Sequence, residues 1–427
     1  MDFTPDFELG GYAEVRASYQ FGVEGVPWAL TERVRPSFKV EPSQRVTAEA
    51  VVESARTEGR YLPQETVDLI SASDLASYLE EGGCTYTVSP RYTTAADYLS
   101  VERLHVDFNL PSLDLVIGRQ AVRWGSGLVF HPTDIYAEVL ATEPWREPKG
   151  VNAVKATVPI GPHQVVGALV LDDDLSGIFP TDGEPFTGVP VSAAVRATAN
   201  VLQSDLSAVS KVSSDGSWFA GWDVRGTTVV GWWDEGGYRS DTKTVENVVG
   251  VDYSLPVLQN LYFAAEYRFD GSGADPLSYD WAARLGGGDS GSVNFDCPEG
   301  TDGGDSYITI DPDITAAGET EQRFTLGRHF VDGVVRLAVN NDVTLQSSVI
   351  FNLADGTGLV VPDFAFNAGP RVALHVGGQV PFGKDGEFRP ESQDLTLRIS
   401  GPGFASYADL SGLVPAATVQ AWARYSF

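Results

Sequence analysis

Long apolar runs are missing from this sequence. No stretch of about 18 consecutive apolar residues occurs, and a transmembrane helix needs roughly 20, so a helical membrane span is excluded. Apolar residues nevertheless make up 43% of the 427 residues. A transmembrane β-strand needs only about 9–11 residues and gives a weak hydropathy signal. Membrane-crossing strands are therefore compatible with this composition, as are soluble β-domains.

Methionine and cysteine are scarce. Met1 is the only methionine, which predicts a mature sequence with an added start codon and a signal peptide already removed. The two cysteines, Cys84 and Cys297, lack Cys-x-x-Cys and haem-attachment spacing, so neither a structural metal nor a covalent haem is expected. One disulfide between them, formed in an oxidising compartment, is predicted.

Basic residues and clustered histidines are also few. The 29 lysines and arginines stand against 58 acidic residues, giving a net charge of −29, which argues against nucleic acid or anionic lipid as a partner. The 5 histidines are scattered without the spacing of metal ligands. Ser126 lies in no Gly-x-Ser-x-Gly motif. Neither a catalytic site, a cofactor nor a metal site is therefore expected.

What the sequence does contain is long two-residue alternation. Residues 7–21 put apolar side chains on one face and Glu8, Glu14 and Arg16 on the other, a run much longer than the usual strand of about 5–6 residues. Residues 27–40 and 45–57 repeat the pattern with Arg, Lys and Glu on the polar face. A soluble core lined by such faces would hold unpaired charge, and no repeat of about 40–50 residues marks propeller blades.

The alternating runs predict an all-β fold, a transmembrane antiparallel up-and-down β-barrel of about 16–18 strands, with about 18 preferred. The runs are Phe7–Phe21, Pro27–Val40, Arg45–Thr57, Val101–Leu110, Leu113–Val122, Val151–Val158, Gln164–Leu171, Val191–Val201, Leu206–Val212, Trp218–Val224, Thr227–Trp233, Val245–Leu255, Leu261–Phe269, Phe324–Val339, Val343–Leu353, Leu359–Phe366, Val372–Phe382 and Val419–Phe427. A further strand within a loop is expected at Leu395–Ile399. Long loops are expected at residues 61–97, 124–149, 172–190, 271–320 and 383–416, within a single barrel domain of residues 1–427.

Two segments resemble known proteins. The last strand, Val419–Phe427, ends on Tyr425 and Phe427, and it resembles the final strand of Gram-negative outer-membrane β-barrels. Residues 117–134 resemble the Gly-Arg-Gln … Trp-Gly-x-Gly … Pro-x-Asp pattern of porin-like outer-membrane families. The resemblance implies a barrel in the lipid of the bacterial outer membrane, acting as a passive channel for small hydrophilic solutes or ions and not as an enzyme.

In general porins the third surface loop folds into the barrel and narrows the channel. The resemblance therefore implies that Trp124, Gly125 and Gly127 let this loop lie close to the inner wall. The residues expected to line the channel and its narrowest section are Arg119, Arg123, Trp124, Asp134, Glu138, Glu143, Arg146 and Glu147 from this loop and the residues that lead into it, with Arg33, Arg35, Arg103 and Asp107 from the wall. A plainer hypothesis is that Arg119 and Asp134 only tether the loop. Arg119 also shares the parity of Leu115 and Ile117, so it faces the lumen only if a bulge intervenes.

Two other functions fit a polar interior. The barrel is alternatively a sleeve that encloses a partner, such as a periplasmic or haem-bearing electron-transfer protein, or a scaffold for a surface enzyme. The inward charges are nearly balanced and the acidic excess lies mostly in loops, which predicts a mild cation preference that fades with added salt. Cys84 and Cys297 fall in predicted surface loops, so their disulfide would tie these loops into a lid.

Overall fold

A computed structural model describes most of the chain. The described residues are 6–21, 28–59, 85–89, 98–136, 147–171, 190–276, 292–296, 309–310, 325–384, 386–389, 396–401, 404–409 and 416–427. The elements with defined bounds in these ranges are all β-strands. No helix among the described residues is both long and apolar enough to cross a membrane.

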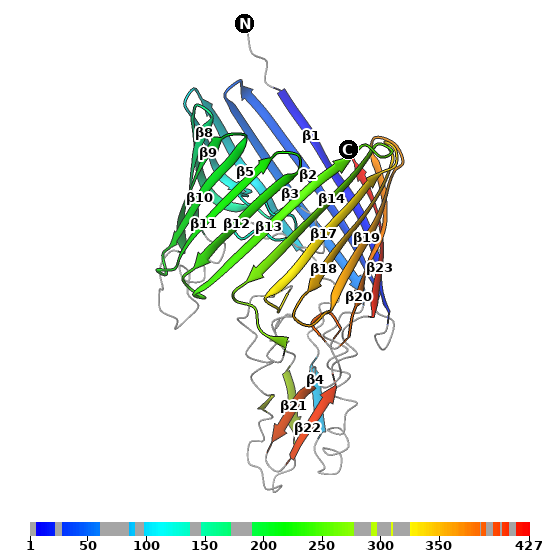
Figure 1. The fold of residues 1–427 in the computed structure, drawn as a ribbon. Coiled ribbons are helices and arrows are strands. Elements are labelled where there is room, and N and C mark those ends of the chain that lie inside the picture. Colours follow the sequence, from blue (N-terminus) through cyan, green and yellow to red (C-terminus); the bar gives the residue numbers. More distant parts are fainter. Residues whose placement is uncertain are drawn as a thin grey trace.

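Eighteen strands form one sheet that closes on itself (Figure 1). They are β1 Asp6–Phe21, β2 Trp28–Ser43, β3 Val46–Gly59, β5 Tyr98–Leu110, β6 Leu113–Gln120, β7 Val151–Ile160, β8 His163–Leu171, β9 Val191–Val201, β10 Ser204–Ser213, β11 Trp218–Thr227, β12 Gly231–Arg239, β13 Thr244–Leu255, β14 Asn260–Asp270, β17 His329–Ala338, β18 Val343–Asn352, β19 Gly358–Asn367, β20 Val372–Phe382 and β23 Ala417–Ser426. Each strand pairs antiparallel with the next, and β1 closes the sheet by pairing with β23. The predicted fold class is confirmed.

The strand positions follow the sequence pattern closely, with two informative differences. The run Thr227–Trp233 was predicted as one strand, but β11 extends to Thr227 and β12 begins at Gly231. The N–H of Thr228 donates to the carbonyl of Val230 over 3.0 Å, so these β-branched residues form a turn despite their strand propensity. The run Phe324–Val339 was predicted to begin too early, because β17 starts at His329 and the residues before it bond elsewhere in the barrel interior.

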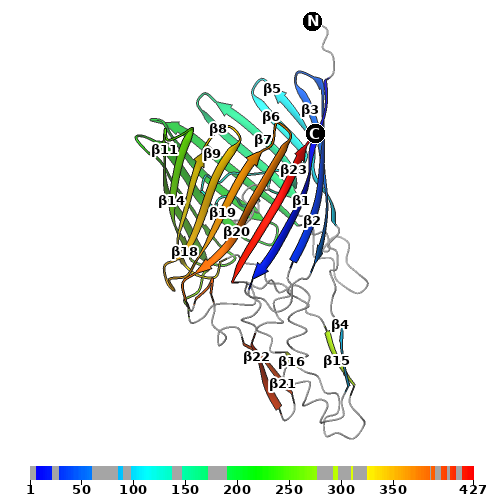
Figure 2. The same cartoon turned by 90° about the vertical axis from the view of Figure 1, so that its right-hand side faces the viewer.

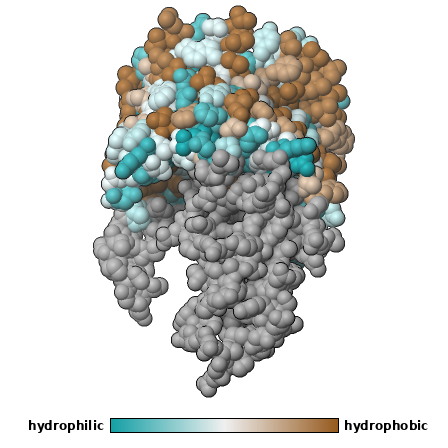
Figure 3. All heavy atoms as spheres, turned by 60° about the horizontal axis from the view of Figure 1, so that its bottom comes forward, coloured by the Kyte–Doolittle hydropathy of each residue, from teal (hydrophilic) through white to brown (hydrophobic). Residues whose placement is uncertain are grey.

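The two faces of the wall have opposite chemistry. Outward side chains such as Leu9, at 72% exposure, and Leu169, at 53%, are apolar and exposed, whereas the inward Glu14, Glu235 and Glu266 are at most 2% exposed. Apolar residues gather over the outer surface of the barrel in the space-filling view (Figure 3). An apolar exterior, a polar interior and closure without free edges are what a bilayer demands of a β-structure.

The two ends of the barrel also differ. Short turns lie at the end where β1 begins and β23 ends (Figures 1 and 2), and the strand ends next to the long undescribed stretches of the chain lie at the other end, called the loop end. Beyond that loop end, β4 (Thr85–Ser89) pairs with β15 (Ser292–Asp296), and β21 (Thr396–Gly401) pairs with both β16 (Thr309–Ile310) and β22 (Phe404–Asp409). The strand expected at 395–399 corresponds to β21. The predicted disulfide lies outside the described residues, because Cys84 and Cys297 both do.

Candidate functional site

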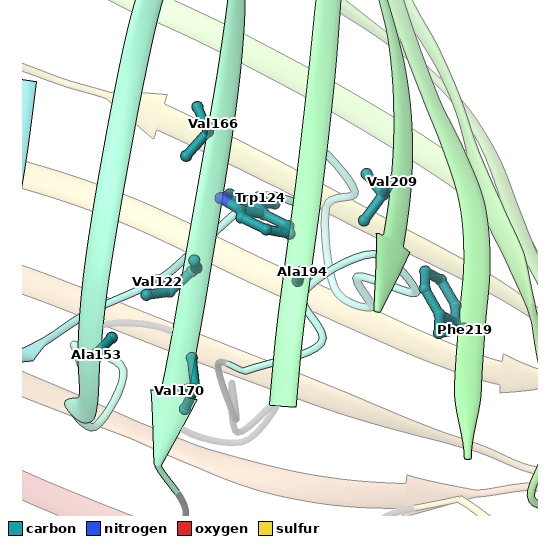
Figure 4. Packing of buried hydrophobic residues seen from close by; sticks show 9 residues of the cluster. Val122, Trp124, Ala153, Val166, Val170, Ala194, Val209 and Phe219 are labelled. Atoms are coloured by element: carbon teal, nitrogen blue, oxygen red, sulfur yellow. The ribbon is translucent and has the colours of Figure 1, made fainter. Parts of the chain in front are cut away.

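The segment that follows β6, residues 121–136, packs against the inner wall of the barrel. Its first apolar side chains, Val122 and Trp124, are 3% and 6% exposed. They contact inward residues of β7 to β11 (Figure 4), namely Ala153, Val166, Ala168, Val170, Ala194, Val209 and Phe219. These wall positions are apolar where an empty lumen would favour polar ones. Trp124 thus anchors the segment in the wall.

Buried carboxylates bind the backbone of this segment. Glu235 on β12 accepts hydrogen bonds from the N–H groups of Ser126 (2.8 Å), Gly127 (2.7 Å) and Thr133 (2.7 Å), and from the Thr133 hydroxyl (2.8 Å). Asp134, within the segment, accepts from the N–H groups of Trp124 and Gly125. A chain without secondary structure must satisfy its buried N–H groups individually, and these two carboxylates do so.

Glu266 on β14 continues the arrangement. It accepts from the N–H groups of Leu128 (2.7 Å), Val129 (3.0 Å) and Phe130 (3.4 Å). The indole N–H of Trp233 also donates to it over 3.2 Å. Two wall glutamates on nearby strands therefore hold residues 126–133 against β12 to β14.

Asp223 on β11 completes the set of wall carboxylates. The hydroxyl of Ser126 donates to it, and Arg196 donates to it over 2.6 Å and also donates to the carbonyl of Trp124. Ser126 is thus used to fix the segment. His131 lies beside Arg123, with 3.4 Å between Nε2 and Nη2, so the contacts made by Ser126 and His131 are structural and not those of a nucleophile and its base.

The two glycines of the predicted motif are required by space. A Cβ on Gly125 would lie 2.6 Å from the Cβ of His131 and 2.8 Å from Glu235 Oε1. A Cβ on Gly127 would lie 2.0 Å from the carbonyl oxygen of Phe130. Gly125 therefore permits close approach to the wall, whereas Gly127 permits the fold of the segment on itself.

The far end of the segment reaches the strands beyond β14. Leu128 and Phe130 pack on Trp233, Val248 and Ala264. Val129 packs on a cluster that comprises Phe330, Ile350, Leu359 and Val361 from β17 to β19, together with Phe388. The guanidinium of Arg268 lies between two rings, 3.4 Å from the centroid of Phe130 and 4.0 Å from that of Phe330. The segment therefore contacts the inner wall from β7 to β19.

A second inward segment, residues 386–389, lies beside residues 121–136. The sequence pattern did not identify it. Glu387 is fully buried and accepts from the N–H groups of Leu326 and Gly327 and from the side-chain amide of Asn352. Its own N–H donates to Asp355 over 2.7 Å. The sequence offers two signals of this contact, the loss of alternation at residues 325–328 and the acidic residue next to Phe388. Neither signal shows that these two stretches bond to each other.

The remaining part of the inner wall carries interleaved charges. Glu14 on β1 accepts from Arg33 on β2 (3.2 Å) and Arg424 on β23 (2.6 Å). Glu53 on β3 lies 3.5 Å from Arg33 and 3.6 Å from Arg35, and Arg35 reaches Glu147 over 2.7 Å. We call these residues, with Arg16, the charged row. The row shares each buried glutamate between arginines, so its charge pairs stabilise one another.

The charged row continues into an aromatic group on the neighbouring strands. Trp422 on β23 stacks on His375, with centroids 4.5 Å apart and planes 7° apart. Arg16 lies 6.0 Å from the Trp422 centroid, and His375 Nδ1 is 3.2 Å from Asp363. Alternation in the sequence could not pair these side chains, because partners on adjacent strands depend on register.

The predicted site residues fall into several groups. Arg33, Arg35 and Glu147 belong to the charged row, and Trp124 and Asp134 hold the inward segment. Arg103 donates to the carbonyls of Glu102 and Pro148, each over 2.7 Å, and Asp107 lies 3.7 Å from His105. Arg123 is 3.4 Å from Asp134. Arg119 stands in register with Leu104 and Asn152 and so has the outward parity of Ile117. Glu138, Glu143 and Arg146 lie outside the described residues.

Burial shifts the titration of two groups in the inward segment. Desolvation, helped by the charge of Arg123, lowers the pKa of His131 to about 4. Desolvation raises the pKa of Asp134, although the N–H groups of Gly125 and Trp124 and the nearby arginines act in the opposite direction. His131 is therefore neutral at neutral pH.

The barrel architecture defines the class of protein. A closed antiparallel barrel with an even strand number, an apolar exterior, short turns at one end and long loops at the other is a bacterial outer-membrane β-barrel. No protein-family model matches the sequence, and no curated protein matches it.

Solved outer-membrane structures are similar in fold. OccK2 (OpdF) of Pseudomonas aeruginosa, solved in complex with glucuronate, has a TM-score of 0.51 at 9% identity, covering 99% of this chain and 98% of that chain. OccAB3 of Acinetobacter baumannii has a TM-score of 0.50 at 9% identity, covering 99% of both chains. At this identity the similarity concerns the fold alone.

Proposed function

We propose that this protein is a passive outer-membrane channel for small hydrophilic solutes or ions, narrowed by residues 121–136. The observation that carries the proposal is the division of the inner wall. One part, from β7 to β19, is covered by the inward segment, which wall carboxylates hold in place. The other part bears the charged row. A solute would pass between a fixed segment and a polar, charged wall.

The chemistry of the charged row suits hydrated and polar solutes. Arg16 and Arg424 are the more accessible arginines of the row, with side chains 11% and 25% exposed. Glu14, which they both contact, is buried beneath them. An anionic group that approaches Glu14 would therefore meet guanidinium groups first, whereas Glu147, also in the charged row, is 67% exposed.

Planar-bilayer recordings test the proposal. The intact protein should give steady single-channel steps. The double variant Glu235→Gln, Glu266→Gln should give larger and noisier steps, because an amide offers one acceptor oxygen in place of two and the inward segment loses N–H partners. Glu246→Gln, a matched change on the inward face of β13 that lies beside Arg239, should leave the steps unchanged.

The same recordings separate the alternatives. Absence of conductance from correctly folded intact protein, together with a periplasmic or haem protein that co-purifies with it, would favour the sleeve. Conductance that is unaffected by Glu235→Gln, Glu266→Gln would retain a channel but remove the role of residues 121–136 in narrowing it.

A further inference from the structure

Five consecutive turns at the terminus-bearing end of the barrel share an unusual composition. They join β5–β6, β7–β8, β9–β10, β11–β12 and β13–β14, and none contains a charged residue. A large aliphatic side chain is exposed in each turn or at the strand end directly before it: Leu110 is 45% exposed, Ile160 54%, Leu202 94%, Val229 82% and Leu258 66%. We call these five residues the apolar rim.

The other turns at the same end are different. Those between β2 and β3, β17 and β18, and β19 and β20 contain Arg45, Asp342 and Arg371 respectively. Because strands are neighbours in chain order around the barrel, the uncharged turns occupy one continuous arc and the charged turns occupy the rest. Chance placement of apolar residues would scatter them around the whole circumference.

Two members of the apolar rim also have an unfavourable backbone. Leu202 has φ of 51° and Leu258 has φ of 54°, in the left-handed region where Gly and Asn are favoured and a bulky side chain is an outlier. A leucine at such a turn gives up backbone stability without gaining burial inside the protein. Contact of this side chain with lipid outside the chain would offset part of that cost.

The apolar rim is continuous with the lipid-facing surface. On β7 the outward Val154 and Val158 lead to Ile160, and on β9 the outward Val195 and Val201 lead to Leu202, all of them exposed. No charged residue intervenes on that face. The surface that contacts hydrocarbon thus extends without a break into the turns.

Strand length points to the same environment. From β6 to β12 the strands have 8 to 11 residues, close to the roughly 9–11 that a tilted strand needs to cross the hydrocarbon. β1, β2 and β3 have 16, 16 and 14 residues. Strands of this length place the turns of the arc at the edge of the hydrocarbon. β17 to β20, with 10 or 11 residues, are similar in length, so the composition of the turns and not strand length sets the arc apart.

We propose that the apolar rim is a lipid-binding surface, inserted among the glycerol and upper acyl groups of the periplasmic leaflet. The charged turns on the opposite side stand in water. The barrel is held at a fixed depth and tilt by this one-sided contact, whatever passes through its lumen. The absence of charge from these turns fits the neutral interfacial region of phospholipids and not their charged headgroups.

Site-specific fluorescence quenching tests the proposal. Single cysteines are introduced as Leu202→Cys, Val229→Cys and Leu258→Cys, with Gln44→Cys and Asn341→Cys in charged turns as matched controls, all in a Cys84→Ser, Cys297→Ser background. Each variant is labelled, folded and placed in phosphatidylcholine vesicles. The three rim positions should lose most of their fluorescence when the lipid carries bromine in its upper acyl chain and little in aqueous iodide, and the controls should behave in the opposite way.

The outcome is decisive in either direction. Rim probes quenched by iodide as strongly as the controls would overturn the proposal. So would rim probes shielded in native membranes but not in pure lipid, since a periplasmic protein would then cover the rim. Hydroxyl-radical oxidation of the unaltered protein provides a measurement without substitutions: Leu202 and Leu258 should be oxidised less in vesicles than in detergent-free unfolded chains, by a larger factor than Val343 beside the charged turn.

Discussion

At the residue scale, the contacts that a side chain makes across the lumen decide its role in the inward segment. Trp124, Gly125, Gly127 and Asp134 were predicted from a motif, and the structure places all of them in the inward segment. Gly125 permits a close approach to the wall, and Trp124 and Asp134 hold the segment in place. Whether a polar residue lines a channel or fixes a loop depends on what lies opposite it across the lumen. Such contacts join positions about a hundred residues apart, as Gly127 and Glu235 do.

Gly127 gives a prediction at this scale. Gly127→Ala should lower the free energy of unfolding by roughly 1–3 kcal/mol, the usual cost of overpacking, because its Cβ would collide with the Phe130 carbonyl. The measurement is the urea midpoint of the heat-modifiable folded band on gels. Gly167→Ala is the matched control, since a Cβ on Gly167 of β8 would meet no atom within 4 Å. Equal midpoints for the two variants would contradict the assignment of a close approach.

At the scale of elements, the alternation of apolar and polar residues was sufficient to locate the barrel strands. The pattern is strong because successive side chains of each strand point in turn to lipid and to the water-filled interior. The pattern failed where interactions other than the contrast between lipid and water determine the backbone conformation. Thr228, Val229 and Val230 have strand-forming side chains but bend in a turn. Residues 325–328 lie outside the ladder, and the N–H groups of Leu326 and Gly327 donate to Glu387. Hydrogen bonds from backbone N–H groups to a buried carboxylate leave no periodic pattern in the sequence.

The disulfide predicted between Cys84 and Cys297 stays a prediction, because both cysteines lie outside the described residues. In the sequence they come directly before Thr85 and directly after Asp296, which pair with each other in the β4–β15 ladder. Closing so long a loop would contribute roughly 4–5 kcal/mol on the entropic account. Protein purified without reductant should therefore show no maleimide-reactive thiol after denaturation and two after reduction. Two reactive thiols before reduction would exclude the bridge.

At the scale of the whole molecule, the net charge and the charge of the passage are separate quantities. The chain carries −29, yet the described inner wall from β23 to β3 presents arginines that cover its buried glutamates. An acidic mouth raises the local concentration of cations only within about 8 Å at 0.15 M salt. Composition alone could not reveal this division, since it required knowing that Glu14 and Glu53 lie beneath their arginine partners.

This division predicts how ion selectivity responds to substitution. Arg16→Gln combined with Arg424→Gln should shift the reversal potential in a potassium chloride gradient toward the cation-selective limit, because two accessible positive charges leave the charged row. The shift should shrink as salt is added. Arg336→Gln, on β17 beside Tyr262 and outside the charged row, is the control. A control shift as large as that of the double variant would show that the charged row does not govern selectivity.

The seam between β1 and β23 bears on how the barrel assembles. Glu14 and Arg424 are 410 positions apart, so their contact closes almost the whole chain, whereas other neighbouring strands meet through far shorter connections. Loop-closure entropy makes such a contact late to form. Until it forms, two strand edges are open to pairing with any other chain. Because Glu14 also bonds to Arg33, the hairpin of β1 and β2 holds this carboxylate in position before β23 pairs. When β23 pairs with β1, Arg424 reaches Glu14 in one register only, so this ion pair selects the correct register.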